Sequence, residues 1–428
     1  MAKTLVVAVP APPEPSAGPD ASVGRANVKI VDVQVTPVHV RMEAPLLWSM
    51  GVETGTTRTI IELTTDDGIA GIGETYGGAA TAKAVLEAKE LFIGTDPMEI
   101  QRLIQRFEVF RVTSEQMTQA ATMKYVAAGV EMAVWDIVGK RLDKPLYRLW
   151  GGDHTFVPFV AYVFYRREHD GVGGEMTPEA ISERYAALVE RSGFEGIKLK
   201  TGVLPPTEEV ATVARLREDH GEGISYLRVD PNQAWSVPTA MRTLRALEAY
   251  DLEYVEDPTW DLHGMSLVRE DSRIPLATNQ AVVSFAHLAP AVRLRAIDVL
   301  LVDLYFWGGV SQAQRVASIC EAFNLGLAMH SDRELGVGTA AGLHFWASTP
   351  QMSHHYDSHY HDQVGDVITE PFEFREGGLH APEGPGLGVT LDRDRLRHHH
   401  DLYLEVGDRA EFFDPDVRPG WTPHLPLF

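Results

Sequence analysis

The sequence has almost no cysteine, no long apolar segment and no excess of positive charge. Cys320 is its single cysteine, which excludes an internal disulfide, and its place in a helical pattern favours a buried structural thiol. No run approaches the roughly 18 apolar residues of a membrane span. The apolar stretch at residues 5–9 is shorter than that of a usual secretory signal, and prolines follow it at once. We therefore expect a cytoplasmic protein with no membrane partner.

The charge that is present is mostly negative. There are 60 acidic against 38 basic residues, a formal net charge of −22, which argues against nucleic acid or an anionic membrane as partner. A solvated acidic surface is the simplest interpretation. With 428 residues, 44% of them hydrophobic, the chain can form a large core in more than one domain.

A series of apolar runs, each closed by a polar residue, dominates the middle of the chain. The first run ends at Lys200, and later runs end at Asp230, Glu256, Asn279, Asp303 and His330, at steps of 30, 26, 23, 24 and 27 residues. Each step has the length of a strand, a helix and two loops. Helical patterns at 208–218, 238–250 and 311–323 lie between the runs. The alternation predicts a closed (β/α) barrel, whose catalytic residues lie at the C-terminal ends of the strands.

The remaining segments predict a second domain and two tails. Residues 1–27, rich in Ala and Pro, predict a flexible leader that packs loosely or swaps onto a neighbour. Within 28–150, a strand at 28–40, a hairpin at 57–76 turning at Asp66-Asp67-Gly68, and helices at 79–92, 97–107 and 119–141 predict an α+β domain. The stretch 43–56 is expected to be a loop that forms a lid over the barrel mouth.

The barrel is expected between residues 151 and 362. Its first strand is placed at 159–165, its last helix at 336–348 and its eighth strand at 354–359. Residues 363–428 are expected to return as strands and a helix. The run His398-His399-His400 is interpreted as solvated helix surface.

Lys198 and Lys200 are two residues apart in the run that ends the second barrel strand. Alternate side chains of a strand share a face, so the two ammonium groups lie side by side and require nearby anions. Their repulsion is expected to lower the pKa of one lysine towards the range of a base.

Two carboxylates supply those anions, and together with a neutral amide they predict a metal site. Asp230, Glu256 and Asn279 end three consecutive strands, and carboxylate and amide oxygens suit a hard cation such as Mg²⁺. Each of these residues alone could merely cap a helix, but three at matched spacing beside two lysines favour a site. Asp303 and His330 end the next two strands, so the carboxylate can orient the imidazole and raise its basicity. Lys200 and His330 then face a bound substrate from opposite sides.

These motifs resemble the enolase superfamily, in its mandelate racemase/muconate lactonizing enzyme branch, and most closely the glucarate dehydratase-like subgroup. The likeness spans about residues 28–422 and is carried by the segments Lys198-Leu199-Lys200, Asp230-Pro231-Asn232-Gln233-Ala234-Trp235, Glu256-Asp257-Pro258, Ala277-Thr278-Asn279, Asp303 with Tyr305-Phe306-Trp307, His330-Ser331, Asp357-Ser358-His359-Tyr360 and residues 384–389.

The resemblance implies a modified TIM barrel, (β/α)7β, with an N-terminal α+β capping domain completed by the C-terminal segment. It also implies a Mg²⁺ cofactor, for which Mn²⁺ can substitute, a small-molecule carboxylate substrate and a homo-oligomer. Lys198 would stabilise the enediolate formed when the α-proton leaves, and Lys200 and the His330–Asp303 pair would be the bases on opposite faces. Asn232 would contact the substrate carboxylate from beside the metal.

The expected activity is that of an acid-sugar dehydratase, a lyase that makes a 2-keto-3-deoxy acid by α-proton abstraction and loss of the β-hydroxyl. A racemase or epimerase on the same scaffold and a non-catalytic paralogue are the alternatives. Here Asp332-Arg333-Glu334 follows His330-Ser331, where the subgroup has an asparagine-rich stretch. The contacts to the far end of the substrate are therefore assigned to Tyr165, Arg166, Arg333 and His359.

Overall fold

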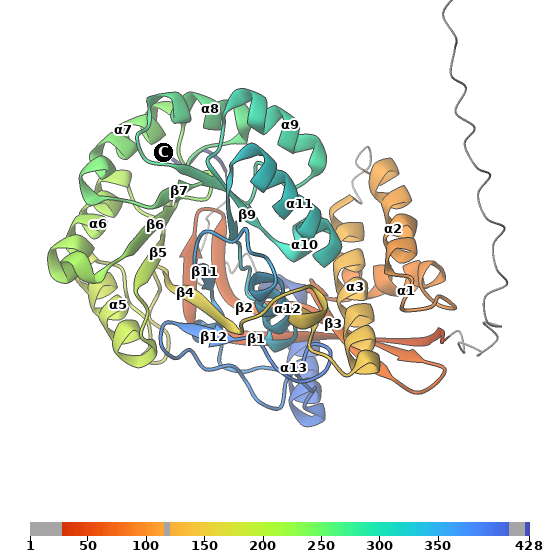
Figure 1. Ribbon diagram of the computed structural model, residues 1–428. Coiled ribbons are helices and arrows are strands. Elements are labelled where there is room, and N and C mark those ends of the chain that lie inside the picture. Colours follow the sequence, from red (N-terminus) through yellow and green to blue (C-terminus); the bar gives the residue numbers. More distant parts are fainter. Residues whose placement is uncertain (1–27, 115–119, 411–423) are drawn as a thin grey trace, which may run out of the picture.

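The computed structural model describes residues 28–114, 120–410 and 424–428. Figure 1 shows two parts: a small antiparallel sheet with helices α1 to α3 beside it, and a larger set of strands inside an outer arc of helices α5 to α9. The leader expected at residues 1–27 lies outside the described residues. In the part of the chain that is described, no helix combines the length and the apolar character needed to cross a membrane.

The N-terminal sheet consists of β1 (Ile30–Trp48), β2 (Gly51–Thr65) and β3 (Ala70–Tyr76), paired antiparallel in that order. The turn between β2 and β3 lies at the predicted Asp66-Asp67-Gly68, where Gly68 has a positive φ of 88°. The predicted loop at 43–56 is wrong, because these residues extend β1 and β2 into one long hairpin that turns between Trp48 and Gly51. The tip of that hairpin reaches the barrel, since Leu47 N donates to Tyr165 O at 2.9 Å.

Helices cover one face of this sheet. They are α1 (Ala79–Glu87), η1 (Ala88–Leu91), α2 (Ile100–Ser114) and α3 (Ala120–Leu142). Helix α3 lies very close to β3. The two backbones approach so closely that a Cβ on Gly71 or Gly73 would collide with the backbone carbonyls of Ala133 and Gly129. The side chains between the sheet and these helices form an apolar core of their own, separate from that of the barrel.

Eight parallel strands form the barrel, in the order of the chain. They are β4 (Phe156–Val163), β5 (Gly196–Lys200), β6 (Tyr226–Asp230), β7 (Tyr254–Glu256), β8 (Leu276–Thr278), β9 (Val299–Val302), β10 (Gly326–Met329) and β11 (Tyr356–Ser358). Each strand from β4 to β9 pairs with the next, and β11 pairs with β4. Between β10 and the chain entering β11, Ser353 N donates to Leu327 O at 3.0 Å, which closes the ring.

Seven long helices connect these strands, which gives the predicted (β/α)7β order. They are α5 (Pro178–Ser192), α6 (Pro206–His220), α7 (Val237–Leu247), α8 (Asp261–Asp271), α9 (Phe285–Leu294), α11 (Val310–Phe323) and α12 (Gly336–Ala347). Shorter pieces are α4 (Leu146–Leu149), α10 (Leu304–Trp307), η2 (Gly221–Gly223), η3 (Glu248–Tyr250) and η4 (Tyr360–Asp362).

Local sequence explains where a barrel helix such as α5 begins and ends. The Thr177 hydroxyl accepts from Ala180 N at the first turn, a proline follows it, and Gly193 adopts the left-handed conformation that ends the helix. In α11, burial raises the pKa of the Cys320 thiol to about 12, which agrees with the predicted structural thiol.

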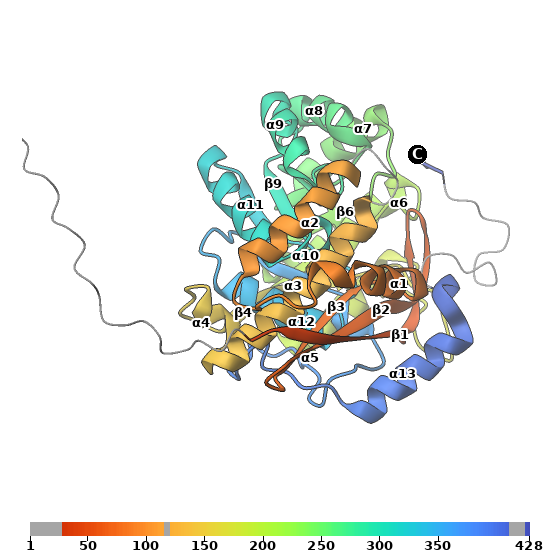
Figure 2. The ribbon, with the colours of Figure 1, turned by 90° about the vertical axis from the view of Figure 1, so that its right-hand side faces the viewer.

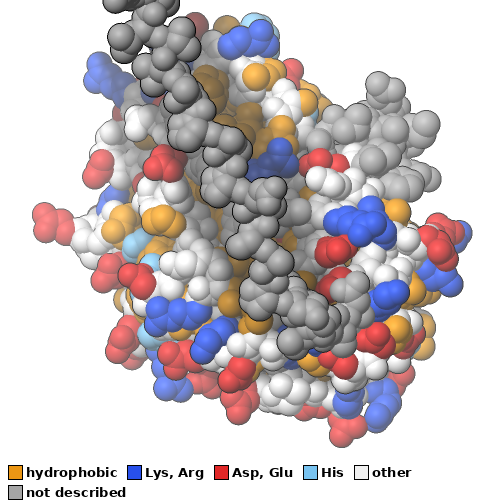
Figure 3. All heavy atoms as spheres, turned by 45° about the vertical axis from the view of Figure 1, so that its right-hand side comes forward, with side chains coloured by type: hydrophobic (Ala, Val, Ile, Leu, Met, Phe, Trp, Pro, Cys, Tyr) orange, Lys and Arg blue, Asp and Glu red, His pale blue; other side chains and the backbone are white. Residues whose placement is uncertain are grey.

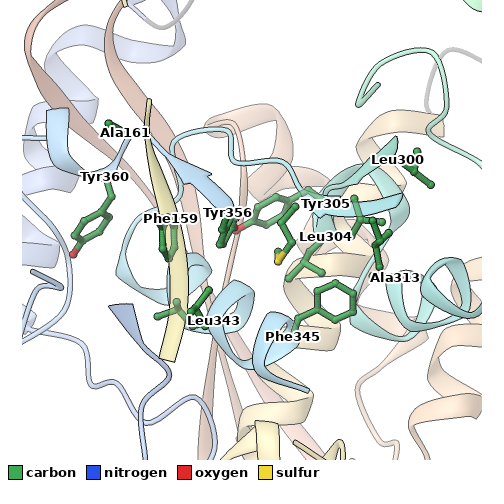
Figure 4. Packing of buried hydrophobic residues seen from close by; sticks show 14 of the residues in the cluster. Phe159, Ala161, Leu300, Leu304, Tyr305, Ala313, Leu343, Phe345, Tyr356 and Tyr360 are labelled. Atoms are coloured by element: carbon green, nitrogen blue, oxygen red, sulfur yellow. The ribbon is translucent and has the colours of Figure 1, made fainter. Parts of the chain in front are cut away.

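The main core lies between the barrel strands and the surrounding helices. In Figure 4, Phe159 on β4 and Tyr356 on β11 lie close to Leu343 of α12, and the two rings stack with centroids 4.7 Å apart. Leu300, Leu304 and Phe345 continue the apolar packing towards α10. The side chains at the strand ends are thereby fixed to a rigid scaffold.

The C-terminal segment packs on both parts. Strand β12 (Gly378–His380) pairs antiparallel with β4, and α13 (Arg393–Val406), followed by η5 (Gly407–Ala410), lies along β1 (Figure 2). The interpretation of His398-His399-His400 as solvated surface is wrong for two of the three. His399 Nδ1 and His400 Nδ1 bind the β1 carbonyls of His39 and Pro37 at 3.1 and 2.7 Å, so they cover the free edge of that strand. On the face drawn in Figure 3, acidic and basic side chains are interspersed, as on a solvated surface.

Candidate active site

A cavity of about 350 Å³ lies at the C-terminal ends of the barrel strands. Its lining comes from both parts of the molecule, with Lys200, Asn279 and His330 from strand ends and Trp48 and Glu53 from the β1–β2 hairpin. A larger hollow of about 800 Å³ lies beside α13, but it contains none of the residues at the strand ends. The smaller cavity is therefore the candidate active site.

The three predicted metal ligands end neighbouring strands. Asp230 closes β6 and Glu256 closes β7, while Asn279 follows β8 directly. Both carboxylates are buried, and Asn279 lines the cavity. Asp257 positions the third ligand, because its carboxylate accepts from Asn279 N at 2.9 Å and from the Thr278 hydroxyl at 2.5 Å.

The surroundings of Glu256 fit a cation. Both of its carboxylate oxygens are buried without a hydrogen bond, and the Lys198 ammonium lies 2.6 Å from Oε2 as an ion pair. Burial, and next the charge of Asp230, raise the pKa of Glu256 to about 8. Within the described ranges, no group of three His, Cys, Asp or Glu side chains is arranged to hold a metal ion. The predicted set contains only two carboxylates, and its third ligand is an amide. Two close carboxylates and an amide oxygen suit Mg²⁺, whose charge would offset their repulsion.

The two lysines differ in burial. Lys198 is fully buried and lies 3.0 Å from Asp357 Oδ2, whereas Lys200 lines the cavity. Burial alone would lower the pKa of Lys198, but Asp357, Glu256 and Asp230 outweigh it and raise the pKa well above its usual value. The expected lowering by the neighbouring lysine is therefore wrong for Lys198, which stays a cation because three carboxylates surround it.

Lys200 and Asn232 form a chain of contacts from Asp230 to the hairpin. Lys200 Nζ donates to Asp230 Oδ2 at 2.7 Å and to Asn232 Oδ1 at 2.8 Å. Burial raises the pKa of Asp230, but Lys200 and Lys198 outweigh it and hold that pKa below the usual value. Asn232 adopts a left-handed conformation, with φ of 50°, and its backbone carbonyl accepts from the Ser49 hydroxyl at 2.9 Å. Gln280 Nε2 donates to Asn232 Oδ1 at 2.8 Å.

Asp303 and His330 are paired as predicted from adjacent strands. His330 Nδ1 lies 3.0 Å from Asp303 Oδ2, and the other oxygen of Asp303 accepts from Tyr305 N and Phe306 N. Burial lowers the pKa of His330, but the hydrogen bond and charge of Asp303 outweigh it, so the pKa is raised. His330 follows β10 and Lys200 ends β5, on opposite sides of the ring of strands, and both line the cavity.

The cavity lining also contains Arg333, in the loop after β10, and His359, directly after β11; these are two of the four residues predicted to contact the far end of the substrate. Arg333 Nη2 lies 2.6 Å from Asp332 Oδ1, and Nη1 lies 3.4 Å from Glu53 Oε1. The ring of His359 packs on Tyr162 and Phe164, with centroids 4.5 and 4.8 Å away. Burial, and then the charge of Arg333, lower the pKa of His359 well below its usual value, so this side chain is neutral.

The other two, Tyr165 and Arg166, do not reach the cavity. Tyr165 points away from it and donates to the Thr212 hydroxyl at 2.9 Å. Arg166 is buried in ion pairs with Glu175 at 2.7 Å and Glu43 at 2.5 Å. Strand parity explains Tyr165, because alternate residues of β4 and its continuation face opposite ways. Arg166 lies beyond the end of β4, and its ion-pair partners hold it away from the cavity.

Tyr162 and Phe164 line the cavity in their place, and the sequence reasoning missed both. The Tyr162 hydroxyl donates to Asp230 Oδ2 at 3.0 Å, and its ring lies 4.4 Å from the Lys198 ammonium. Asp357, which pairs with Lys198, was not among the predicted site residues, although it lies 27 residues after His330, the spacing of the other strand ends.

The sequence of this chain matches two family models and is similar to several known proteins. Residues 30–151 match the family model "Mandelate racemase / muconate lactonizing enzyme, N-terminal domain", and residues 180–395 match "Enolase C-terminal domain-like". A "Probable glucarate dehydratase" from Streptomyces coelicolor is 36% identical, over 94% of this chain and 99% of that protein. A "Chloromuconate cycloisomerase" from Cupriavidus pinatubonensis is 29% identical, over 79% of this chain and 90% of that protein.

Among solved structures, an enolase from Thermobispora bispora crystallised with magnesium and formate superposes with a TM-score of 0.86. It is 36% identical, and the match covers 94% of this chain and 100% of that one.

Proposed function

The chain belongs to the mandelate racemase/muconate lactonizing enzyme family of the enolase superfamily, and from this premise we propose that it is a Mg²⁺-dependent acid-sugar dehydratase. The reaction removes the proton on the carbon next to a carboxylate and expels the neighbouring hydroxyl as water, which leaves a 2-keto-3-deoxy acid. The proposed metal ligands are Asp230, Glu256 and Asn279, and Mn²⁺ is expected to substitute for Mg²⁺.

One observation carries the proposal. Lys200 and His330 line the same cavity from opposite sides of the barrel, and the carboxylates of Asp230 and Glu256 end strands between them. A carboxylate substrate held there has a proton acceptor on each face of its α-carbon. The magnesium bound by a similar solved structure and the dehydratase name of a relative at 36% identity support the same reaction.

Stabilisation of the charge that develops on the substrate is assigned to Lys198. A proton next to a carboxylate is very weakly acidic, and a bound Mg²⁺ would supply positive charge at that carboxylate. With all three carboxylates of Asp230, Glu256 and Asp357 ionised, this group and the two lysines would carry one net negative charge, and a divalent cation would make it one net positive charge. Because Lys198 stays protonated, it can neutralise an enediolate without accepting a proton.

His330 is proposed to deliver the proton that allows the hydroxyl to leave. Its raised pKa keeps a share of the imidazole protonated near neutral pH, and the hydrogen bond to Asp303 fixes which nitrogen faces the cavity. Lys200 is proposed as the base on the other face, and Asn232, whose side-chain oxygen accepts from Lys200, is proposed to contact the substrate carboxylate beside the metal.

The runner-up is a racemase or epimerase on the same scaffold, which a base on each face of the substrate also fits. Such an enzyme exchanges the α-proton between Lys200 and His330 and expels nothing. The relative named as a cycloisomerase shows that the family includes reactions other than dehydration.

Incubation of sugar acids with enzyme and Mg²⁺ in D₂O tests the proposal. Formation of keto acid supports dehydration. Deuterium incorporation with inversion and without keto acid indicates the isomerase, and neither product rejects both reactions.

A further inference from the structure

Each of the two proposed bases is followed by a short segment that connects its strand to a helix. The chain leads from Lys200, at the end of β5, to α6, and from His330, directly after β10, to α12. A buried carboxylate binds backbone N–H groups in each of these segments. The two carboxylates are those of Glu209 and Glu74, and neither is among the described residues that line the cavity.

Glu74 reaches from the N-terminal domain to the start of α12. It lies on β3, and its Oε1 and Oε2 accept from Leu335 N and Gly338 N, each at 2.8 Å. The N-cap residue of α12, Leu335, makes no capping hydrogen bond with its side chain, so Glu74 supplies acceptors that the start of the helix lacks. Leu335 lies five residues after His330. The carboxylate therefore fixes the far end of the segment that begins at this base.

The position of Glu74 is fixed in turn by its own domain. Its backbone N–H points at Met132 Sδ of α3, 3.4 Å away, and Gly73 beside it allows the close contact between α3 and β3. Arg58 Nε lies 3.4 Å from Glu74 Oε1, and both side chains are fully buried. The start of α12 is thus held against a rigid sheet.

Glu209 holds the segment after Lys200 from within the barrel. It lies near the start of α6, and its Oε1 accepts from Val203 N at 2.8 Å and from Leu204 N at 3.0 Å. Val203 lies three residues after Lys200. The other oxygen of Glu209, Oε2, is buried without a hydrogen bond. The segment is therefore held through a single carboxylate oxygen.

Both carboxylates lie in surroundings that disfavour their charge, because burial raises the pKa of Glu74 and of Glu209 to about 7. Perturbed carboxyl groups are common at functional sites. We propose that Glu74 and Glu209 are positioning residues, Glu74 for His330 and Glu209 for Lys200, each acting through the segment that follows its base. This inference rests on the proposed function and names the residues that set the geometry of each base.

Exchange of the α-proton in D₂O with the Mg²⁺-loaded enzyme tests the two faces separately. One epimer of a sugar acid presents its α-proton to His330 and the other presents it to Lys200, and proton NMR of unreacted substrate measures both rates. Glu74→Gln leaves one oxygen where two N–H groups need two, so exchange at the His330 face should fall by about 10 to 100-fold. Exchange at the Lys200 face should change little.

Glu209→Met should give the reverse pattern, since it removes the oxygen that binds the segment after Lys200 and keeps a side chain of similar length. Each variant is thus the matched control for the other. A purely structural role would lower exchange at both faces. Equal losses at the two faces, or no loss at the face assigned to the altered residue, contradict the inference. If thermal unfolding shows that one variant does not fold, the other decides by the same comparison.

Amide hydrogen exchange separates failure of this inference from failure of the proposed function. If the enzyme yields neither keto acid nor α-proton exchange with any sugar acid, the proposed function is rejected. Mass spectrometry of peptides then decides on the positioning role. Faster amide exchange should be confined to residues 331–338 in Glu74→Gln and to residues 201–204 in Glu209→Met. Unchanged exchange in these segments, or an equal increase in both segments in either variant, overturns the inference.

Discussion

The two walls of the cavity are built in different ways. The strand-end wall is made of side chains that adjacent parallel strands hold in register, and its lysines and carboxylates contact one another between strands. The facing wall combines the tip of a hairpin with the loop after β10, and its charges are paired both between these two segments and within the loop. The residues proposed for the chemistry thus lie on a rigid barrel, while the hairpin and the loop contribute the remaining lining of the cavity.

Glu256→Gln, on the strand-end wall, is expected to have the largest effect on activity. This change removes a charge from the proposed metal site with little change of shape, and several kcal/mol of stabilisation by the metal corresponds to a loss on the order of 10⁴-fold in kcat/KM. Calorimetric titration with Mg²⁺ is the direct measurement. Activity that survives exhaustive EDTA treatment, or normal Mg²⁺ affinity in the variant, contradicts the assignment.

His330→Asn tests the proton donor on the same wall. Dehydration of every substrate should fall by about 10³-fold, since a positioned acid or base contributes roughly 10² to 10⁴-fold. Slow exchange of the α-proton through Lys200 should persist for the epimer whose α-proton faces Lys200. Proton NMR of unreacted substrate in D₂O measures both, and Lys200→Arg should show the reverse pattern. Keto acid formed by His330→Asn near the wild-type rate would remove the histidine from this role.

Asp303→Asn should have a smaller effect and also change the pH profile. The carboxylate raises the pKa of His330, so without its charge the limb of kcat/KM governed by His330 should move to lower pH. The loss of activity should be about 10 to 100-fold. Asparagine keeps an oxygen for Tyr305 N and Phe306 N, so unfolding experiments should show a folded protein. If the pH profile of kcat/KM does not shift in Asp303→Asn, Asp303 does not set the pKa of His330 as stated.

The smallest effect is expected on the hairpin side, from Ser49→Ala. The Ser49 hydroxyl joins the hairpin tip to the Asn232 carbonyl, and a hydrogen bond of this kind contributes about 1 kcal/mol. KM should therefore rise about fivefold with kcat little changed, as steady-state kinetics can show. A fall in kcat larger than the rise in KM would mean that the hairpin takes part in the chemistry and not only in binding.

Most of the barrel could be predicted because its signal is periodic. The steps between Lys200, Asp230, Glu256 and His330 are regular, and each of these residues ends a strand or directly follows one. Residues 43–56 could not be assigned in the same way. They form a hairpin because each half pairs with the other, with Leu46 opposite Glu53, and long-range pairing of this kind leaves no periodic pattern in a stretch rich in Met, Trp and Gly.

The far wall of the site was the least predictable part. Tyr165 was one residue out of phase with Tyr162 and Phe164, because alternate side chains face opposite ways, whereas Arg166 shares their parity but is held by Glu43, Glu175 and Asp362. Arg333 was identified from its position after His330, but its pairing with Glu53 joins residues 280 positions apart in the chain.

The sequence by itself determined the order of strands and helices and the polar residue at each strand end, because both follow from local periodicity and from the direction of parallel strands. Tertiary structure alone decided the electrostatic state of those residues. Lys198 stays charged because strands β6, β7 and β11 bring three carboxylates to it, and Arg333 is compensated because a hairpin from another part of the chain places Glu53 against it. Such states depend on burial and on distances of a few ångströms across the fold, and no local pattern of residues encodes them.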